Sequence, residues 1–402
     1  YAKDQQRQLF DRSKAHLNGQ VVTTPTEQIA ELTSLLHYHE WRYYVQDDPV
    51  LSDYEYDTLY KKLEALEADH PELVTPDSPT QRVGSDLTGD FQSVPHLVPM
   101  LSLGNSYNAE DLTEFDKQVK RMLNMDEATP LPYAVEPKYD GGTIVLVYEN
   151  DRLIRAATRG NGVLGEEITH NARVIKSIPL TAKFSKYGLH RVEVRGEVII
   201  RKDRFAKMNA QREKDGKTLY ANPRNTATGG LRMKSPAEVA DRNLEAFIYS
   251  FGYGVDEAGN DAIQALGTHT KALDVLTELG FKVPATGYER EQAPDITAAA
   301  AFCAQWEAQR EDYAYEIDGM VVKVDDLVLQ ERAGYTSHHP RWAIAYKFAA
   351  KQATTTLEKV EYQIGKIGTL TPVAKTTPVS LAGVMISSEP GSSASACIYS
   401  GG

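Results

Sequence analysis

The chain has 402 residues, of which 41% are hydrophobic and 25% are charged. This is the composition of a globular protein with an ample core, large enough for two or three domains. Its two cysteines are far apart, which excludes a disulfide-built scaffold and a cysteine-rich zinc site. No apolar run approaches the roughly 20 residues that span a membrane, and the polar start lacks the apolar core of a signal peptide. We therefore expect a cytoplasmic monomer without a membrane partner.

The net charge of −12 argues against a nucleic-acid partner, because phosphate contacts require lysine and arginine. The charge is uneven, however. Between residues 191 and 234, basic residues outnumber acidic ones by roughly two to one. Such a run is either a solvated face or part of a DNA-binding surface, and the sequence leaves both interpretations open.

Residues 1–88 are predicted to form a helical domain. Thr24–Glu27 and Ser52–Glu55 each have the spacing of a capping box at a helix start, and a proline stands at the first helical position of the former. Residues 75–79, with two prolines, then indicate a rigid connection. Apolar residues recur at helical spacing after each start, at Ile29, Leu32, Leu35, Leu36 and Tyr43 and then at Tyr56, Leu59, Leu63 and Leu66.

Residues 89–352 are predicted to be a mixed domain of strands and helices. Two apolar runs, 144–148 and 153–157, flank a short polar turn and indicate a β-hairpin. Residues 192–200 and 320–324 also have strand character. Hairpin-linked strands, rather than strict strand–helix alternation, predict antiparallel sheets and the α+β class. The sequence contains neither a Rossmann nor a Walker-type glycine-rich loop.

Residues 353–402 are predicted to contain short strands, since 359–364 have a β-like pattern. The segment from Ser387 to Ala396 is rich in serine and lacks any packing pattern. We expect this tail to be disordered or foreign to the native chain.

The chemistry is predicted to lie in the segment Glu136–Gly142, just before a strand. Lys138 and Asp140 are two residues apart, so both side chains point to one face of an extended chain. A lysine acts as a nucleophile only when its amine has lost its proton, which burial or nearby positive charge favours. Further cations and carboxylates near predicted strands, of the kind that stabilise phosphoryl transfer and bind Mg²⁺ or sugar hydroxyls, are Arg159, Arg195, Glu197, Glu316, Asp318, Lys323 and Lys347.

Each of these elements is weak by itself. A lone lysine is far more often a solvated surface residue than a nucleophile, and an Arg-Gly-Glu triplet is usually a turn or an exposed strand edge. The ordered set, in which each element stands beside a predicted strand, favours a phosphate-handling site.

The order of these motifs resembles the nucleotidyltransferase motifs of covalent ligases and capping enzymes. Longer segments, namely 78–84, 221–225, 340–345 and 371–374, are similar to the NAD-dependent bacterial DNA ligases in particular, and the similarity runs from about residue 27 to 386. The resemblance implies a helical domain that binds nicotinamide mononucleotide (NMN). It also implies an ATP-grasp-like nucleotidyltransferase domain of antiparallel sheets and the start of an oligonucleotide-binding (OB) barrel.

The resemblance also implies a reaction and a site. Lys138 would attack the adenylyl phosphorus of NAD⁺, release NMN and form a lysine–AMP phosphoramidate. The AMP would pass to the 5′-phosphate of nicked double-stranded DNA, and attack by the 3′-hydroxyl would seal the nick. The implied nucleotide contacts are Glu136 and Lys323 at the base, Asp140, Arg159 and Glu197 at the sugar, Lys347 at the phosphate, and Ser102 and Leu103 as a further contact. Arg224, Arg232 and Arg310 are implied as basic support for the nucleotide or the nick. Asp318 and Glu197 are candidates for binding Mg²⁺.

The helical domain would select the dinucleotide by binding its nicotinamide half. Aromatic rings stack on a cationic pyridinium, and carboxylates offset its charge. Considered alone, the tyrosines would be interpreted as helix-packing aromatics, but residues 52–57 match the family as a unit. The implied residues are Tyr43, Tyr44, Asp53, Tyr54, Glu55, Tyr56 and Asp57.

Three positions depart from the family pattern. Asn161 stands where aspartate is usual, Tyr44 where histidine is common, and Lys366 where an Arg-Thr pair opens the barrel. The zinc-finger, helix-hairpin-helix and terminal modules of the family have no counterpart here, so we expect no protein zinc site. We also expect this polypeptide to adenylate itself with NAD⁺ and to seal nicks poorly.

Two other interpretations stay open. A nucleotidyltransferase that uses ATP or GTP, such as an RNA ligase or capping enzyme, would share the Lys138 motif but gives no reason for residues 43–57. A DNA-binding module without catalysis would use the basic segment 191–234. Its binding would weaken steeply with salt, and it would carry no covalent AMP.

Overall fold

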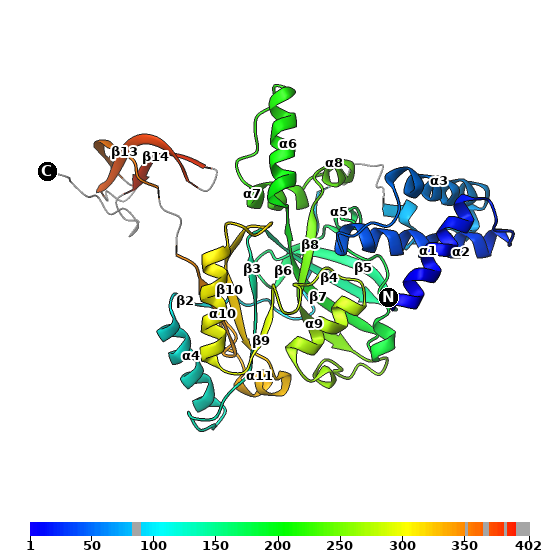
Figure 1. The fold of residues 1–402 in the computed structure, drawn as a ribbon. Helices are drawn as coiled ribbons and strands as arrows, with labels where there is room; N and C mark the ends of the chain where they lie inside the picture. The colour runs from blue at the N-terminus through cyan, green and yellow to red at the C-terminus, as the bar shows by residue number, and fades with distance from the viewer. Residues whose placement is uncertain (83–89, 350–352, 365–369, 382–383, 391–402) are drawn as a thin grey trace. The chain divides into compact units, whose positions relative to one another are not determined.

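The computed structural model contains two compact units. The first comprises Tyr1–Lys217 and Pro223–Phe348, and the second comprises Thr218–Asn222 and Ala349–Gly402 (Figure 1). Among the residues that the structure describes, no helix is both long and apolar enough to cross a membrane. The described residues are 1–82, 90–349, 353–364, 370–381 and 384–390.

Three helices form the N-terminal part of the first unit: α1 (Lys3–Leu17), α2 (Pro25–Glu40) and α3 (Asp53–Asp69) (Figure 1). Both predicted capping boxes are confirmed. The side chains of Thr24 and Ser52 accept hydrogen bonds from the amides of Glu27 and Glu55, whose carboxylates bond back to the cap residues. A small apolar core joins α2 and α3, and its buried members are Ile29, Leu32, Leu36, Leu59 and Leu63.

Tyr43 does not continue the apolar stripe of α2, so that prediction is wrong. After Glu40 the chain enters a π-helical turn, η1 (Trp41–Val45), which contains more residues per turn than an α-helix. The change of period rotates the following side chains away from the buried face, and Tyr43 is 40% exposed. Two short turns, η2 (Pro71–Leu73) and η3 (Pro79–Arg82), follow α3 near the predicted proline-rich connection.

A four-stranded antiparallel sheet confirms the predicted hairpin and has the order β5-β4-β7-β8. Asn150 and Asp151 join β4 to β5 with φ values of 51° and 66°. Positive values are typical of the two-residue turn whose twist matches that of its strands. The bounds are β4 Gly142–Glu149, β5 Arg152–Thr158, β7 Arg191–Ile199 and β8 Glu245–Val255.

The second large sheet has five strands in the order β2-β11-β10-β3-β9. Its other pairs are antiparallel, as predicted, but β2 runs parallel to β11, so the sheet is mixed. A parallel pair needs a long connection, and most of the first unit separates these two strands in the sequence. The bounds are β2 Gly104–Ser106, β3 Tyr133–Tyr139, β9 Glu291–Ala293, β10 Ile317–Val324 and β11 Ala343–Lys347.

Helices pack on both sheets and complete two hydrophobic cores. α5, α7 and α9 contact the four-stranded sheet, whereas α10 contacts the five-stranded sheet and α4 packs on α10 (Figure 1). The mixture of helices and sheets that the α+β prediction requires is confirmed. The remaining bounds are α4 Ala109–Met122, α5 Thr169–Arg173, α6 Lys202–Lys214, α7 Pro223–Leu231, α8 Pro236–Asp241, α9 His269–Glu278, α10 Ile296–Gln309, α11 Leu327–Ala333, η4 Phe184–Tyr187, η5 Gln264–Leu266, and the paired strands β1 Ser93–Pro95 and β6 Leu164–Glu166.

The second unit contains a three-stranded antiparallel sheet, β12-β13-β14, and confirms the strand predicted at 359–364. Ser387–Pro390 belong to β14, so the prediction of a structureless tail is wrong for these residues. Backbone pairing with β13 supplies the order that the polar side chains do not. Residues 391–396 and Lys366 lie outside the described residues. The bounds are β12 Leu357–Ile364, β13 Leu370–Leu381 and β14 Val384–Pro390.

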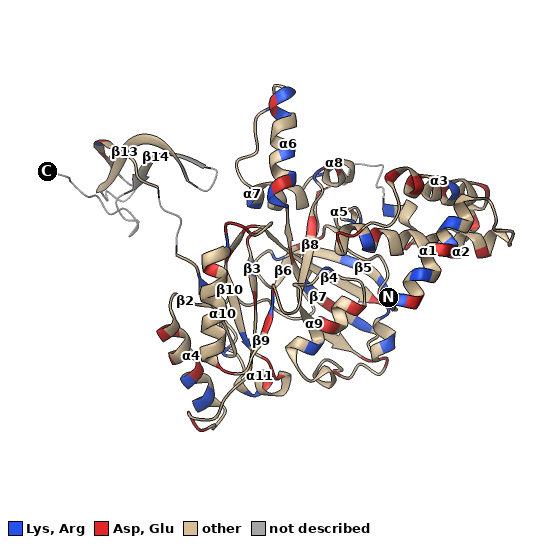
Figure 2. Cartoon of the chain, viewed as in Figure 1, with Lys and Arg blue, Asp and Glu red and all other residues tan. Residues whose placement is uncertain are grey.

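The basic segment 191–234 is divided among several elements rather than gathered on one. Arg191 and Arg195 belong to β7, and other basic residues lie on α6 and α7. No residue of α6 is buried, and Figure 2 shows lysine and arginine along this helix together with acidic residues. The solvated-face interpretation therefore fits α6.

Candidate active site

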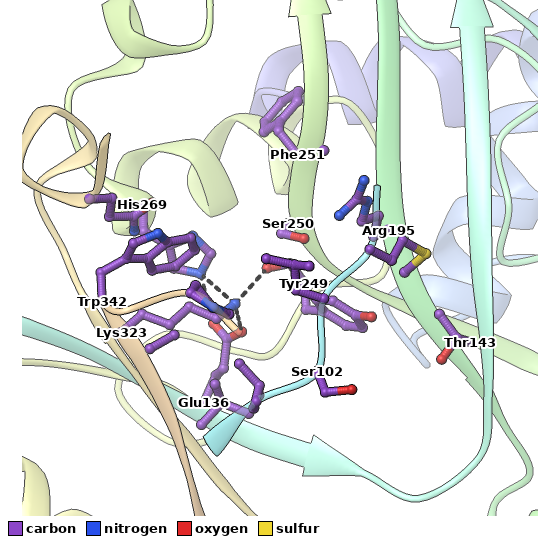
Figure 3. A pocket seen from close by; sticks show the side chains of 18 of the residues that line it. Ser102, Glu136, Thr143, Arg195, Tyr249, Ser250, Phe251, His269, Lys323 and Trp342 are labelled. Atoms are coloured by element: carbon purple, nitrogen blue, oxygen red, sulfur yellow. Dashed lines mark hydrogen bonds and ion pairs between the residues drawn. The ribbon is translucent and has the colours of Figure 1, made fainter. Parts of the chain in front are cut away.

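A cleft of about 1060 Å³ lies between the two large sheets of the first unit. β3, β10 and β11 line it from one sheet, and β4, β7 and β8 line it from the other, together with the non-helical segment 98–103. Figure 3 shows Glu136, His269 and Lys323 gathered at one end and Arg195 on the other side. Of the predicted site residues, the lining includes Ser102, Leu103, Glu136, Lys138, Asp140, Arg159, Glu197, Arg224, Asp318, Lys323 and Lys347.

Lys138 lies at the end of β3, where its ammonium group meets a carboxylate. Its Nζ is 3.1 and 3.2 Å from the two carboxylate oxygens of Asp318, and Nζ of Lys347 is 2.7 Å from one of them. The Lys138 side chain is 28% exposed, so a ligand in the cleft can reach it. Lys138 precedes β4, as predicted, but it also lies within β3, where it pairs with Gly319 of β10.

Gly319 allows three strands to approach closely at Lys138. It pairs with Lys138 on one side and with Lys347 on the other. A Cβ at Gly319 would lie 2.1 Å from the backbone oxygen of Tyr346, so a side chain there would force β11 away. Asp318 stands at a register shift, the kind of irregularity that re-aims a side chain. The Asp-Gly pair thus places one carboxylate between two lysines.

Glu136, Lys323 and His269 form a buried ionic cluster at one end of the cleft (Figure 3). Lys323 Nζ is 2.5 Å from one Glu136 oxygen, and His269 Nε2 is 2.9 Å from the other. Burial alone raises the pKa of Glu136, but attraction to Lys323 and His269 outweighs burial and lowers the pKa to about 2. Burial and Lys323 lower the pKa of His269. The carboxylate is therefore ionised and held in one orientation at neutral pH.

Glu197 and Asp140 are two carboxyl groups with raised pKa values. Burial raises the pKa of Glu197 to about 7, against the lowering effects of its hydrogen bond from Thr143, at 3.1 Å, and of Lys138. Burial also raises the pKa of Asp140, and the guanidinium of Arg224, 3.3 Å away, opposes the rise. Glu197 is therefore partly protonated near neutral pH.

The raised pKa of Glu197 makes protein stability depend on pH. The pKa of Glu197 rises from 4.5 to about 7 on folding. Its contribution to the free energy of unfolding is therefore fully present below pH 4.5 and is lost as pH rises through 7. Over this pH range the free energy of unfolding of the wild type should fall by at most about 3 kcal/mol relative to that of Glu197→Gln, and its Tm should fall accordingly. Thermal unfolding of both proteins at a series of pH values measures the difference. Parallel profiles would contradict it.

The segment 98–103 is tied to the loop that follows β5. Arg159 donates a hydrogen bond from Nη2 to the hydroxyl of Ser102 at 3.0 Å. In the same loop, the side-chain oxygen of Asn161 accepts hydrogen bonds from the amides two and three residues further on. An aspartate would accept the same bonds. The departure at Asn161 therefore preserves this turn while removing a negative charge.

Nine predicted site residues are not among the described residues that line the cleft. Some of them serve local structure: Glu55 closes a capping box, Tyr56 donates to Glu40 at 3.2 Å, and Arg232 pairs with Glu166 at 2.6 Å. The expected nicotinamide contacts therefore stay a prediction. The nine residues are Tyr43, Tyr44, Asp53, Tyr54, Glu55, Tyr56, Asp57, Arg232 and Arg310.

Several aromatic residues that the sequence did not predict also line the cleft, among them His269, Tyr249 and Trp342. The Lys323 ammonium lies 5.5 Å from the centre of the Tyr249 ring, and His269 bonds to Glu136. Trp342 falls in a segment that resembles the family, but His269 and Tyr249 belong to no motif. The only local feature that marks either position is the threonine that caps α9, directly before His269.

A magnesium ion held by protein groups alone does not fit this cleft. Among the described residues, no group of three or more His, Cys, Asp or Glu side chains could hold a metal ion. Of the two candidates, Asp318 already contacts Lys138 and Lys347, and the pKa of Glu197 is about 7. The two lysines at Asp318, and the proton that Glu197 partly retains near neutral pH, both disfavour binding of a dication.

Two family models match the chain. The model of the NAD-dependent DNA ligase adenylation domain matches residues 88–351, and that of the DNA ligase-like, N-terminal NAD⁺-binding domain matches residues 22–84. The two large sheets and the lysine-bearing cleft lie within the first of these matches. The chain belongs to the NAD-dependent DNA ligase family.

Three curated relatives show how much of the family's length the chain spans. The DNA ligase of Persephonella marina is 51% identical over 394 residues, which are 96% of this chain and 54% of the relative. The DNA ligase of Sulfurihydrogenibium azorense is 49% identical, and the match covers 96% of this chain and 55% of the relative. That of Aquifex aeolicus is also 49% identical, and the match covers 89% of this chain and 48% of the relative. The chain therefore spans about half the length of the curated relatives it matches. The match to a solved structure named Pmar-Lig_PreS3 covers 82% of this chain and 60% of that one, with 11% identity and a TM-score of 0.36.

Proposed function

We propose that this chain is the adenylating part of an NAD-dependent DNA ligase, in which Lys138 takes AMP from NAD⁺. The observation that supports this most directly is the position of Lys138. Its side chain lines the cleft, its Nζ is 3.1 Å from a carboxylate oxygen of Asp318, and it belongs to β3, which also carries Glu136. Family membership points to the dinucleotide as the donor. Mass spectrometry of the protein after incubation with NAD⁺ tests the proposal.

The buried cluster would bind the base, and the opposite wall would bind the sugar. Each Glu136 oxygen has a second lone pair, so the fixed carboxylate can accept a hydrogen bond from the exocyclic amine of adenine. Lys323 would contact the ring. Glu197 would accept from a ribose hydroxyl, and Arg159 would donate to one, with Asp140 close to the sugar. These residues all line the cleft, which makes simultaneous contact feasible.

In the first step, Nζ of Lys138 would attack the adenylyl phosphorus. A phosphorus–nitrogen bond forms, the bond from phosphorus to the bridging oxygen breaks, and NMN leaves with that electron pair. The attacking amine first gives up a proton, and Asp318 is within hydrogen-bond distance to accept it. Lys347, on the other side of Asp318, would stabilise the negative charge on the phosphate oxygens.

The AMP would then pass to the 5′-phosphate of nicked double-stranded DNA, and the 3′-hydroxyl would seal the nick. Arg224, with a 61% exposed side chain at the cleft, is a candidate contact for a phosphate. In this proposal residues 1–88 bind NMN, 89–352 form an ATP-grasp-like nucleotidyltransferase domain, and 353–402 are part of an OB barrel. The protein would be a cytoplasmic monomer.

Tyr43→Ala and Asp53→Ala should each slow reaction with NAD⁺ by about tenfold or more, because the ring and the carboxylate would contact the cationic nicotinamide. Both variants should seal pre-adenylated nicked DNA at the wild-type rate, since that substrate carries no nicotinamide. Tyr288→Ala, which alters another exposed tyrosine, is the matched control. Equal losses in both reactions would argue against a nicotinamide role.

A further inference from the structure

One wall of the cleft is a segment that the proposed reaction does not explain. The strap, defined as residues 96–103, has no regular secondary structure and carries Ser102. Backbone hydrogen bonds hold both its ends. The amide of His96 donates to Val163 at 3.0 Å, and that of Ser102 donates to His338 at 3.0 Å. Between these ends, the amide of Met100 donates to Gly162 at 2.8 Å, and two residues of β7 also hold the strap.

Glu193 and Arg195 form this middle tie. Glu193 is 0% exposed, and one of its oxygens accepts the amide N–H of Leu97 at 2.8 Å. The other oxygen accepts two hydrogen bonds from Arg195, at 3.0 and 2.8 Å. The guanidinium in turn donates to the backbone oxygen of Val98 at 2.6 Å. Both oxygens of one buried carboxylate are therefore used on groups that fix the strap.

The neighbouring strand is shaped around this pair. Gly252 of β8 faces it, and a Cβ there would lie 2.5 Å from Nε of Arg195 and 2.7 Å from Oε1 of Glu193. The register between β7 and β8 also shifts beside both residues. Such shifts re-aim side chains, so the backbone as well as the sequence accommodates the Glu193–Arg195 pair.

We propose that Glu193 is a positioning residue for the nucleotide that reacts with Lys138, acting through Arg195 and the strap; this inference rests on the proposed function. Glu193 is not among the residues that line the cleft, whereas Arg195 and Val98–Leu103 are. A change at Glu193 therefore acts on a bound nucleotide through those groups and not by direct contact. A loosened strap has to be ordered when the nucleotide binds, which weakens binding and leaves the chemistry of the bound state largely unchanged.

Glu193→Gln keeps the shape of the side chain but removes one acceptor. Its single oxygen can accept either the Leu97 amide or the Arg195 guanidinium, and its NH₂ group then opposes a donor on the other side. In self-adenylation by the whole chain, we expect the half-saturating NAD⁺ concentration to rise about tenfold, with the rate at saturation within about threefold of wild type. The conservative variant Glu193→Asp, which keeps the charge, should recover part of this loss.

Asp116→Asn is the matched control. Asp116 is a buried carboxylate of α4 that pairs with Lys120 at 2.8 Å and accepts from Tyr133 at 2.6 Å, and it does not line the cleft. Its loss should lower the Tm and leave the half-saturating NAD⁺ concentration unchanged. If Glu193→Gln raises that concentration no more than Asp116→Asn does, the positioning role is overturned.

Hydrogen exchange in the wild-type protein tests the tie even if a variant fails to fold. The Leu97 amide lies outside the strands, yet it should exchange slowly because Glu193 accepts its proton. Glu193→Gln should speed exchange in the strap but not in β10. Fast exchange at Leu97 in the wild type would overturn the inference even where NAD⁺ adenylates the protein. A protected Leu97 amide in a protein that takes no AMP from NAD⁺ would instead refute the proposed function, so the two failures are distinct.

Discussion

Lys138→Ala should reduce AMP transfer from NAD⁺ by at least about 10³-fold, because it removes the attacking nitrogen itself. The other two lysines of the cleft are engaged elsewhere. Lys323 is paired with the buried carboxylate of Glu136, and Lys347 contacts the outer side of Asp318. Neither is expected to replace the nucleophile. Intact-protein mass spectrometry after incubation with NAD⁺ measures the yield of the AMP adduct.

The matched control for this variant is Lys186→Ala, which removes an exposed lysine from η4. Its adduct yield should equal that of the wild type. An undiminished AMP adduct on Lys138→Ala would contradict the assignment, and mapping the modified peptide would then locate the true acceptor.

Lys323→Met should lower the free energy of unfolding by about 3 kcal/mol or more and abolish nucleotide binding, because it leaves the buried Glu136 carboxylate without its main counter-ion. In the wild type the pKa of Glu136 is lowered to about 2, so this stabilisation is present above pH 4.5 and is lost as pH falls towards 2. Without Lys323, burial dominates and raises the pKa of Glu136. The deficit of the variant should therefore shrink as pH falls, which urea unfolding at about pH 5 and about pH 8 measures.

Lys120→Met separates general destabilisation from loss of the site. Lys120 also pairs with a buried carboxylate, that of Asp116 at 2.8 Å, but on α4 and outside the cleft lining. Its loss should destabilise the protein while leaving AMP transfer intact below the unfolding temperature. Equal loss of AMP transfer in both variants would show that Lys323 has no particular role in binding.

Local structure was predictable wherever the stabilising contacts span only a few residues. The capping box at Thr24–Glu27 closes within one helical turn, and the turn at Asn150 and Asp151 needs only two residues that tolerate positive φ. The prediction that Tyr43 continues the apolar stripe was wrong because the helix changes type just before it. A single π-helical turn rotates the side chains that follow it away from the apolar face, and no residue type in the sequence indicates such a turn.

Only the motif-bearing part of the candidate site was predictable from the sequence. Lys138, Asp318 and Lys347 stand in motifs whose order implied a common site, and the structure brings them together. His269 was missed because its role depends on Glu136, 133 residues away. Glu193 was missed because alternation along a strand cannot distinguish a solvated carboxylate from one that is fully buried by a distant loop. Non-local polar contacts of this kind become apparent only after the chain is folded.

The most direct test of Lys138 as the group that takes AMP from NAD⁺ is the intact mass of the whole chain, measured as purified and again after incubation with Mg²⁺ and either NAD⁺ or ATP. The starting mass shows whether AMP is already attached, and chains that carry it are first discharged with pyrophosphate or NMN. We expect a gain of one AMP with NAD⁺, none with ATP, and none with NAD⁺ when Lys138 is changed to alanine. A gain from ATP and not from NAD⁺, or no gain from NAD⁺ by a chain free of AMP, would contradict this expectation.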